Sequence, residues 1–151
     1  MDKYVHRNKL SKKAVFSLKE GNNMQLTLQK CTKKEINTLR QISIETYYDT
    51  FASMNTVKTM QAYLETAFSK DKLEQELEEK DSLFLFLKKK EEIAGYLKLN
   101  EALAQTDIHD KVSVEIERIY VRRKFQGQGF GMYLMENVIQ IALQRKSVIF
   151  G

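Results

Sequence analysis

The chain has 151 residues, of which 42% are hydrophobic and 30% charged, enough for one globular domain with a buried core. A single cysteine, Cys31, excludes an internal disulfide framework and favours a reducing compartment, for which we predict the cytoplasm. No apolar run reaches the roughly 18 residues of a membrane span, so we expect no membrane partner. The two histidines, His6 and His109, are isolated, which argues against a metal site.

The net charge of +5 is concentrated near the N-terminus. Residues 1–23 hold six Lys or Arg against two Asp or Glu, which leaves residues 24–151 almost neutral. This distribution argues against nucleic-acid binding by the body of the chain. The first 23 residues show no sustained amphipathic period, so we predict a basic leader that is disordered or that precedes a native start at Met24. A nucleic-acid-binding arm is the remaining alternative for this leader.

Residues 24–31 alternate apolar and polar side chains, which predicts a short strand. Thr32 and Glu35 then have the spacing of a capping box, which marks the start of a helix. The predicted buried face of this first helix repeats at steps of three and four residues: Ile36, Leu39, Ser43 and Tyr47.

Two more helices are predicted before the hydrophobic period changes. Asn55 or Thr56 is placed to cap the second helix. The third begins near Asp71, uses Leu73 and Leu77, and is otherwise so acidic that we interpret its charges as a solvated face. The predicted buried face of the second helix is Val57, Met60, Leu64 and Ala67.

Residues 82–101 contain two apolar runs around a charged connector and predict a β-hairpin that turns at 89–92. Residues 102–111 are polar and resemble a loop. Residues 112–121 predict a strand in which the apolar positions change parity, a sign of a β-bulge.

The segment QGQGFG, residues 126–131, follows this strand. A helix is predicted from Tyr133 to Arg145, and residues 147–150 begin another strand. The order of elements indicates an α+β fold whose last two strands run parallel on either side of a helix.

The glycine segment has the properties of an anion-binding turn. It lacks the Gly-Lys-Ser/Thr ending of a P-loop and lies too late in the chain for a dinucleotide fingerprint. Glycine lets a phosphate approach the main chain without a Cβ, and the N-terminus of a helix favours an anion. We therefore expect this turn to hold a phosphate group.

The segment also resembles the Gln/Arg-x-x-Gly-x-Gly/Ala signature of the GCN5-related N-acetyltransferase (GNAT) family, and the flanking EIERIYV and amphipathic helix fit that context. The stretches SIETYYDTF, AYLETAF and EIAGYLKLN are most similar to PaiA-type spermidine/spermine N-acetyltransferases. The resemblance implies an α+β GNAT fold, in which helices flank a central mixed β-sheet, and acetyl-CoA as co-substrate.

The resemblance further implies how acetyl-CoA is held. The main chain of the strand before the turn would pair with the pantetheine arm, and the amides of the turn would bind the pyrophosphate. The basic residues Arg122, Arg123 and Lys124 are candidates for CoA phosphates, with exposed loop charges as the alternative. The implied cofactor-binding residues are Ile119, Tyr120, Val121, Arg122, Gln126, Gly127, Gln128, Gly129, Phe130 and Gly131.

Acetyl transfer to an amine requires that the ammonium lose a proton. Glu115 and Glu117 are two residues apart on one strand and share a face, so either is a candidate base, directly or through water. The alternative is that both only form salt bridges, with Arg118 or with a neighbouring strand. The backbone amide of Ile119 or Val121 would support the oxyanion.

A polyamine acceptor, which the resemblance implies, requires acidic and aromatic side chains. Glu45 and Asp49 have helical i, i+4 spacing within SIETYYDTF, and Tyr47 and Tyr48 would offer aromatic faces to a cation. The alternative is a helix with a solvated acidic face and buried tyrosines. The predicted substrate-binding residues are Glu45, Asp49 and Tyr48.

We therefore predict an acetyl-CoA-dependent N-acetyltransferase that transfers acetyl to a primary amine of a polyamine or similar small amine within a ternary complex. A homodimer is compatible with the family. Family members continue beyond residue 151 with a further helix and strands, so residues 24–151 resemble an incomplete N-acetyltransferase domain. The alternatives are a truncated relative with impaired turnover and a regulatory protein that binds CoA or polyamine without catalysis.

Overall fold

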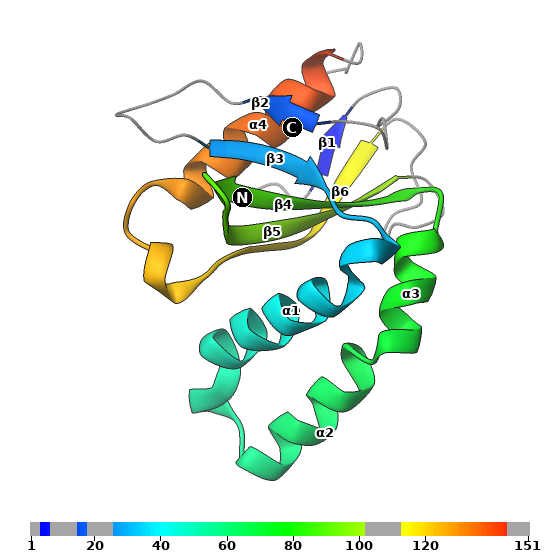
Figure 1. Cartoon of the computed structure of the whole chain (residues 1–151), viewed down its shortest axis with the longest axis vertical. Helices are drawn as coiled ribbons and strands as arrows, with labels where there is room; N and C mark the ends of the chain where they lie inside the picture. Colours follow the sequence, from blue (N-terminus) through cyan, green and yellow to red (C-terminus); the bar gives the residue numbers. More distant parts are fainter. Residues whose placement is uncertain (1–3, 7–14, 18–25, 102–112, 145–151) are drawn as a thin grey trace.

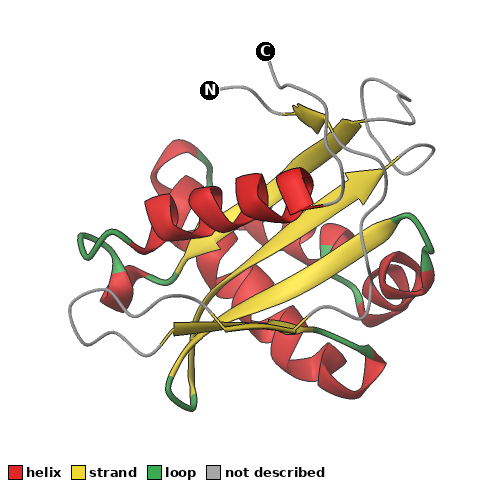
Figure 2. Ribbon diagram, turned by 90° about the horizontal axis from the view of Figure 1, so that it is seen from above, coloured by secondary structure: helices red, strands yellow, loops and turns green. Residues whose placement is uncertain are grey.

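The computed structural model describes residues 4–6, 15–17, 26–101 and 113–144. These residues form one six-stranded sheet with helices on both faces (Figures 1 and 2). Helix α4 covers one face, and α1, α2 and α3 lie on the other (Figure 2). The predicted α+β architecture is confirmed.

The sheet has the order β1-β6-β5-β4-β3-β2, and each neighbouring pair of strands is antiparallel. Two of its short strands, β1 and β2, belong to the segment for which the sequence predicts a disordered leader. The parallel strand predicted at 147–150 and the loop predicted at 102–111 lie outside the described residues. The strands are β1 (Tyr4–His6), β2 (Val15–Ser17), β3 (Leu26–Lys30), β4 (Ser82–Lys89), β5 (Glu92–Glu101) and β6 (Ser113–Val121).

The hairpin between β4 and β5 is confirmed, and its turn consists of Lys90 and Glu91. Lys90 has a φ of 57°, in the left-handed region that tight turns use. Both strands are buried along most of their length, on both faces, which explains why the sequence of β4 reads as a continuous apolar run.

The predicted bulge in β6 is also confirmed, and the extra residue is Glu117. On β5 the consecutive residues Lys98 and Leu99 pair with Arg118 and Ile116, so Glu117 has no residue opposite it. An inserted residue exchanges the two faces of the strand beyond it. The residues of β6 that pack toward α4 therefore change parity, from Val114 and Ile116 to Ile119 and Val121.

The described helices are α1 (Ile36–Phe51), α2 (Val57–Ala67), α3 (Lys70–Glu78) and α4 (Phe130–Gln144), with 3₁₀ turns at η1 (Lys33–Glu35), η2 (Ala52–Met54) and η4 (Arg123–Phe125).

The helix starts follow the predicted capping chemistry. Thr32 and Glu35 form the predicted capping box, in which the N–H of Thr32 donates to Glu35 Oε1 over 2.8 Å. This box opens η1, which continues directly into α1. Thr56 rather than Asn55 caps α2, because its hydroxyl accepts from the N–H of Thr59 over 3.1 Å.

Two predictions about helices were wrong. Val57 is 69% exposed: its spacing places it on the same helix face as Met60 and Leu64, but the first turn of α2, in which it lies, extends beyond the packed core. Helix α4 begins at Phe130 instead of Tyr133. The ring of Phe130 is buried against that of Phe125, with centroids 5.9 Å apart, and this contact fixes the first turn of the helix inside the glycine segment.

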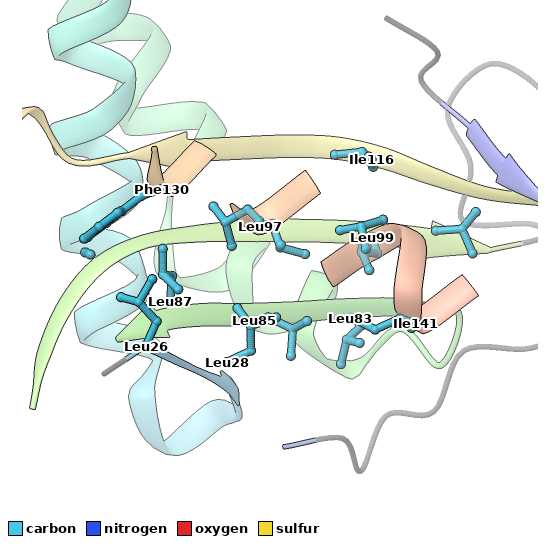
Figure 3. Packing of buried hydrophobic residues seen from close by; sticks show 14 of the residues in the cluster. Leu26, Leu28, Leu83, Leu85, Leu87, Leu97, Leu99, Ile116, Phe130 and Ile141 are labelled. Atoms are coloured by element: carbon cyan, nitrogen blue, oxygen red, sulfur yellow. The ribbon is translucent and has the colours of Figure 1, made fainter. Parts of the chain in front are cut away.

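The two faces of the sheet have separate cores. The core between the sheet and α4 consists of aliphatic side chains from the strands and from α4, among them Ile141, together with Phe125 and Phe130 (Figure 3). The core beneath α1, α2 and α3 contains more aromatic residues, among them Phe68, Phe84 and Tyr96. The candidate site lies on this second face.

Candidate functional site

The glycine segment forms an open turn between η4 and α4. Gly127 and Gly129 have φ values of 78° and 82°, where an L side chain is strained. A Cβ built on either glycine, or on Gly131, meets no atom within 4 Å. The first N–H groups of α4 have no acceptor within the helix and lie at its positive end. This open main chain fits a phosphate group, as the sequence predicts.

Side chains of the same segment hold the turn in place. The amide of Gln126 donates to the carbonyl of Val121 over 3.0 Å, which ties the turn to the end of β6. The ring of Phe130 is buried in the core, while Gln128 is exposed. Gln126 and Phe130 therefore use their side chains for structure, which leaves the main chain as the group available to a ligand.

One edge of β6 is open beside this turn. The strand pairs with β5 along one edge as far as Val121, whereas β1 pairs on the other edge only with Ser113 to Glu115. In the described part of the chain, no strand covers that second edge from Ile116 onward. The main chain of Ile119, Tyr120 and Val121 can therefore pair with an extended arm, as the resemblance implies for pantetheine. The turn and this edge together fit acetyl-CoA.

A pocket of about 290 Å³ lies between β6 and the helices α1, α2 and α3. The rings of Tyr47 and Tyr63 stack in its wall with centroids 4.6 Å apart, and Tyr47 meets Phe68 edge to face at 5.8 Å. Its aromatic lining is Tyr47, Tyr63, Phe68 and Tyr120, and its polar lining is Lys72, Glu76, Glu117 and Arg118.

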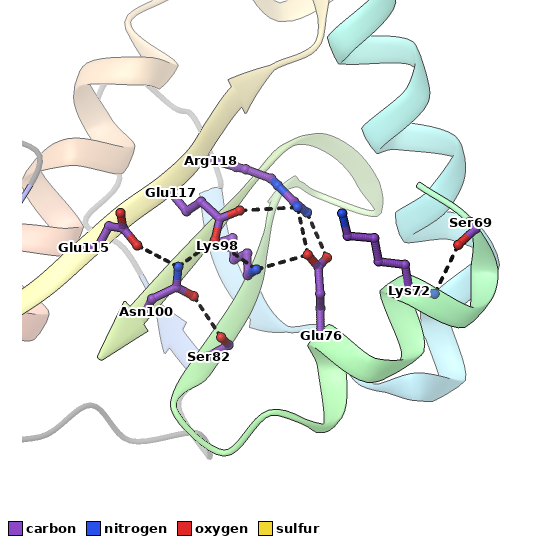
Figure 4. A network of polar contacts seen from close by, with 9 residues as sticks. All are labelled: Ser69, Lys72, Glu76, Ser82, Lys98, Asn100, Glu115, Glu117 and Arg118. Carbon is purple, nitrogen blue, oxygen red and sulfur yellow. Dashed lines mark hydrogen bonds and ion pairs between the residues drawn. The ribbon is translucent and has the colours of Figure 1, made fainter. Parts of the chain in front are cut away.

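A network of buried polar groups lies behind the pocket (Figure 4). The amide nitrogen of Asn100 donates to Glu115 over 2.9 Å and to Glu117 over 2.6 Å. The amide oxygen of Asn100 accepts from the hydroxyl of Ser82 over 2.8 Å. The ammonium of Lys98 lies 2.9 Å from Glu117. One asparagine and one lysine therefore join two carboxylates of β6.

Glu76, on α3, extends this network across to β6. Its carboxylate accepts two bonds from Arg118, at 3.0 and 3.2 Å, and one from Lys98 at 3.3 Å. The guanidinium of Arg118 also lies 3.3 Å from Glu117 and 5.4 Å from the ring centre of Phe68. Each carboxylate of the pocket is thus balanced by a cation.

The structure distinguishes the two carboxylates that the sequence proposes as a base. Glu115 is fully buried and does not line the pocket. The side chain of Glu117 is 21% exposed and lines it. Both carboxylates contact Asn100, so they do share a face, and Glu117 also forms the salt bridges that the alternative reading expects. Of the two, Glu117 is the one that an acceptor in this pocket can reach.

Electrostatics keep the groups of the pocket in fixed protonation states. Burial raises the pKa of Glu117, but Lys98, the Asn100 amide and Arg118 outweigh burial and hold this pKa below its ordinary value of 4.5. Burial lowers the pKa of Arg118, but Glu76 more than compensates and raises it. The carboxylate of Glu117 is therefore ionised at neutral pH. Burial also raises the pKa of Tyr120, so its phenol stays neutral.

The acids predicted to bind substrate contact the arginines predicted to lie near phosphate. Arg122 donates to both oxygens of Glu45, at 2.8 and 3.2 Å, and to the carbonyl of Ile93 at 3.0 Å. Arg123 lies 3.8 Å from the Asp49 carboxylate. Together with Lys124 these side chains line a second, more open pocket of about 540 Å³. They do not line the aromatic pocket.

The tyrosines of α1 also divide between two environments. Tyr47 forms part of the aromatic wall, whereas Tyr48 is 48% exposed and does not line the pocket. Tyr48 therefore lies apart from Glu117. Each alternative for this helix therefore holds in part. Tyr47 lines the aromatic pocket, as a substrate-binding helix would require, whereas Glu45 and Asp49 contact arginines outside that pocket.

Sequence reasoning missed several polar residues of the site, and the three that contact the carboxylates or cations of β6 are Glu76, Lys98 and Asn100. Glu76 was included in the solvated face of the acidic helix, yet it lies three residues after the buried Leu73 and so shares its face. Lys98 and Asn100 are polar residues in a buried strand, on the same face as Tyr96. The helical spacing of Glu76 from Leu73, and the alternation of side chains along β5, were the sequence signals that could have identified these residues.

Three further observations concern the cysteine, metal ligands and membrane crossing in the described residues. Burial raises the pKa of the Cys31 thiol to about 12, so this cysteine behaves as a small apolar side chain. In this part of the chain, no three His, Cys, Asp or Glu side chains converge on a point that could hold a metal ion. None of its helices combines the length and the apolarity that crossing a membrane requires.

Comparison with known proteins identifies the family. Residues 37–150 match the Acetyltransferase (GNAT) family. The chain is 42% identical over 105 residues to an uncharacterized N-acetyltransferase in the pepI 3' region of Lactobacillus delbrueckii subsp. lactis. This match covers 70% of the present chain and 61% of the relative, so the chain spans about three fifths of that protein.

Solved structures share the fold at low sequence identity. A PaiA N-acetyltransferase from Thermoplasma acidophilum in complex with coenzyme A has a TM-score of 0.67 and 19% identity, over 82% of this chain and 76% of that one. An aminoglycoside acetyltransferase from an uncultured soil metagenomic sample, in complex with sisomicin, has a TM-score of 0.58 and 16% identity, over 82% and 73%. The GNAT family uses acetyl-CoA, which agrees with the predicted co-substrate. From the family match, the glycine turn and the bulged strand, we conclude that the chain belongs to the GNAT family of acetyltransferases.

Proposed function

We propose that this chain is an acetyl-CoA-dependent N-acetyltransferase that acetylates a primary amine of a small cationic acceptor, with spermidine and spermine as the first candidates. Family membership supports acetyl transfer. The observation that carries the acceptor class is the aromatic pocket, into which the bulge of β6 directs the ionised carboxylate of Glu117.

The donor site consists of the open edge of β6 and the glycine turn. The main chain of Ile119 to Val121 would hold the pantetheine arm, and the amides of the turn would hold the pyrophosphate. Bound there, acetyl-CoA supplies an activated acetyl group. Arg123 and Lys124 contact the carboxylates of Asp49 and Glu92, but their side chains are largely exposed. They are therefore better placed for CoA phosphates than Arg122, which is less exposed and bound to both Glu45 and the carbonyl of Ile93.

The acceptor ammonium would bind between the aromatic rings and Glu117, because both attract a cation. The carboxylate would accept a hydrogen bond from the nitrogen, orient it and help to remove its proton, directly or through water. Starting from the ammonium, the nitrogen loses two protons and gains the acetyl group. One proton leaves through Glu117 or water to the solvent, and the departing thiol of CoA carries the other away.

Two structural neighbours support a small amine as acceptor, since one is a PaiA N-acetyltransferase and the other is an aminoglycoside acetyltransferase in complex with sisomicin. Their identity to this chain is below 20%, so their acceptors guide the choice of compounds to test.

The test is a thiol-release assay with acetyl-CoA and a panel of spermidine, spermine and simple monoamines. We expect saturable thiol release with at least one amine, together with a rise in melting temperature on addition of acetyl-CoA. A rise in melting temperature without thiol release from any amine would instead support the regulatory alternative. A folded protein that shows neither response would refute the proposal.

A further inference from the structure

We infer that Lys98 and Asn100, two residues apart on β5, are positioning residues for Glu117. They hold one carboxylate oxygen of Glu117 in place and keep the group ionised, so that its other oxygen faces the acceptor amine across the working pH range. This inference rests on the proposed function, in which Glu117 contacts the acceptor.

Glu117 requires such support because it is the extra residue of the bulge. Its neighbour Arg118 pairs with Lys98 across the strands, whereas Glu117 has no residue opposite it on β5. A bulge re-aims a side chain but leaves the extra residue outside the regular ladder. The direction of the carboxylate therefore depends on side-chain bonds.

Those bonds treat the two oxygens of Glu117 differently. Oε1 accepts from the amide of Asn100 over 2.6 Å and lies 2.9 Å from the ammonium of Lys98. Among the described residues, Oε2 has one polar contact, at 3.3 Å from the guanidinium of Arg118. Two short bonds on Oε1 fix the plane of the carboxylate, and they leave Oε2 as the oxygen with spare acceptor capacity for an incoming amine.

The orientation of Asn100 is itself determined by its surroundings. Its side chain is fully buried, and its oxygen accepts from the hydroxyl of Ser82. The amide nitrogen must then point toward β6, where it donates to Glu115 as well as to Glu117 (Figure 4). One amide nitrogen thus donates to two carboxylates, and this shared donor offsets the repulsion between them.

Lys98 supplies the charge that makes this arrangement stable. Its side chain is only 7% exposed, and its ammonium lies between Glu117 and Glu76 and 5.5 Å from the ring centre of Phe84. Burying an unpaired ammonium costs free energy, so the two carboxylates determine where the ammonium of Lys98 lies. After burial, which raises the pKa of Glu117, the charge of Lys98 has the largest influence on it and lowers it.

The other charged and titratable groups around Glu117 come from every element packed against it. From β6 these are Glu115, Arg118 and Tyr120; from α3, Lys72 and Glu76; from α1, Tyr47; and from α2, Tyr63. Among the cations, Lys98 is the one that can be replaced while Arg118 still balances Glu76.

The test is the pH dependence of kcat/KM for the amine in wild type and in Lys98→Met. Removing the cation raises the pKa of Glu117, so the acid limb of the profile should move to higher pH, by about one pH unit, which corresponds to a tenfold change in proton concentration. Lys98→Arg retains the charge and should keep the limb near its wild-type position. Lys88→Met, a partly buried lysine of β4 outside the network, is the matched control and should leave the profile unchanged.

A second variant tests Asn100 separately. Asn100→Asp replaces the donor with a third carboxylate of the same shape, so the acid limb should move up further than in Lys98→Met. Thermal melts establish that each variant is folded. An unchanged limb in folded Lys98→Met, or an equal loss of activity at all pH values, would overturn the inference, because a merely structural role predicts the second result.

Binding provides a readout that does not require turnover. The affinity for spermidine, measured by calorimetry across pH, should show the same shift in Lys98→Met. If spermidine binds with this shift but is not acetylated, the proposed function fails and the inference stands as a statement about amine binding. If spermidine is acetylated without the shift, the inference alone fails.

Discussion

The two faces of the central sheet arise from the same strands but differ in chemistry. On β4 and β5 the residues that face α4 are aliphatic, as Leu85 and Leu97 illustrate. On the opposite face, the same strands carry aromatic residues, such as Phe84 and Tyr96, together with the polar residues Ser82, Lys98 and Asn100. One face supplies stability through apolar burial alone, whereas the other buries charges next to the pocket.

The polar face differs from the aliphatic face because its buried charges lose their hydration, which costs free energy. A buried ion pair is weak evidence for stability, because desolvation offsets much of the attraction. The network of Lys98, Arg118, Glu76 and Glu117 is therefore better explained by the chemistry of the pocket than by folding. Variants on the two faces should separate accordingly, into effects on stability and effects on activity.

The largest expected effect is on the aliphatic face. Leu97→Ala should lower the free energy of unfolding by about 3 kcal/mol, because the side chain is fully buried beneath α4 and its removal leaves a cavity. Urea denaturation measures this loss. Leu97→Met conserves the volume and should cost less than about 1.5 kcal/mol. If the two variants lost the same free energy of unfolding, the tight packing of this face would not be the source of its stability.

On the polar face, Glu117→Gln should act on catalysis. We expect kcat/KM to fall about 100-fold, because the amide can neither attract the ammonium nor accept its proton. The thiol-release assay measures this change. Glu78→Gln, on the exposed side of α3 and paired with Lys33 at the surface, is the control and should retain full activity. Wild-type kinetics in Glu117→Gln would remove this carboxylate from the reaction.

The glycine turn offers a test in which two similar substitutions should have opposite signs. Gly129→Ala should lower the free energy of unfolding by about 1 kcal/mol, since its φ of 82° is strained for alanine. Gly131→Ala should raise it by up to about 1 kcal/mol, since this residue lies in α4 with open space around it. Denaturation curves of both variants provide the comparison, and two losses of similar size would contradict this geometry for the turn.

The smallest effect concerns Ser43, on the buried face of α1. Its hydroxyl is fully buried and makes no hydrogen bond of ordinary length among the described residues, although the buried hydroxyl of Tyr96, which also has none, lies near it. Ser43→Ala should therefore stabilise the protein by up to about 1 kcal/mol, because alanine also favours a helix. Thr46→Val is the contrasting variant, since the Thr46 hydroxyl donates to Ile42 over 2.8 Å and its loss should destabilise. A destabilised Ser43→Ala would indicate a partner for this hydroxyl.

Local chemistry explains which parts of the fold could be predicted from the sequence. The capping box at Thr32, the hairpin turn at Lys90 and the glycine turn depend on residues within a few positions of one another. The bulge at Glu117 was visible as a change of parity within one strand. The positions that were wrong, Val57 and the start of α4, lie at helix ends, where tertiary packing selects the boundary.

The sequence by itself determined the order of elements from β3 to α4, the open glycine turn and the identity of two candidate carboxylates. Only the tertiary structure decided which carboxylate reaches a pocket and what surrounds it. Glu76 meets Arg118 across 42 residues, and Glu45 meets Arg122 across 77. Such pairs depend on how α1 and α3 pack on the sheet, and no local periodicity encodes the distance between residues that far apart.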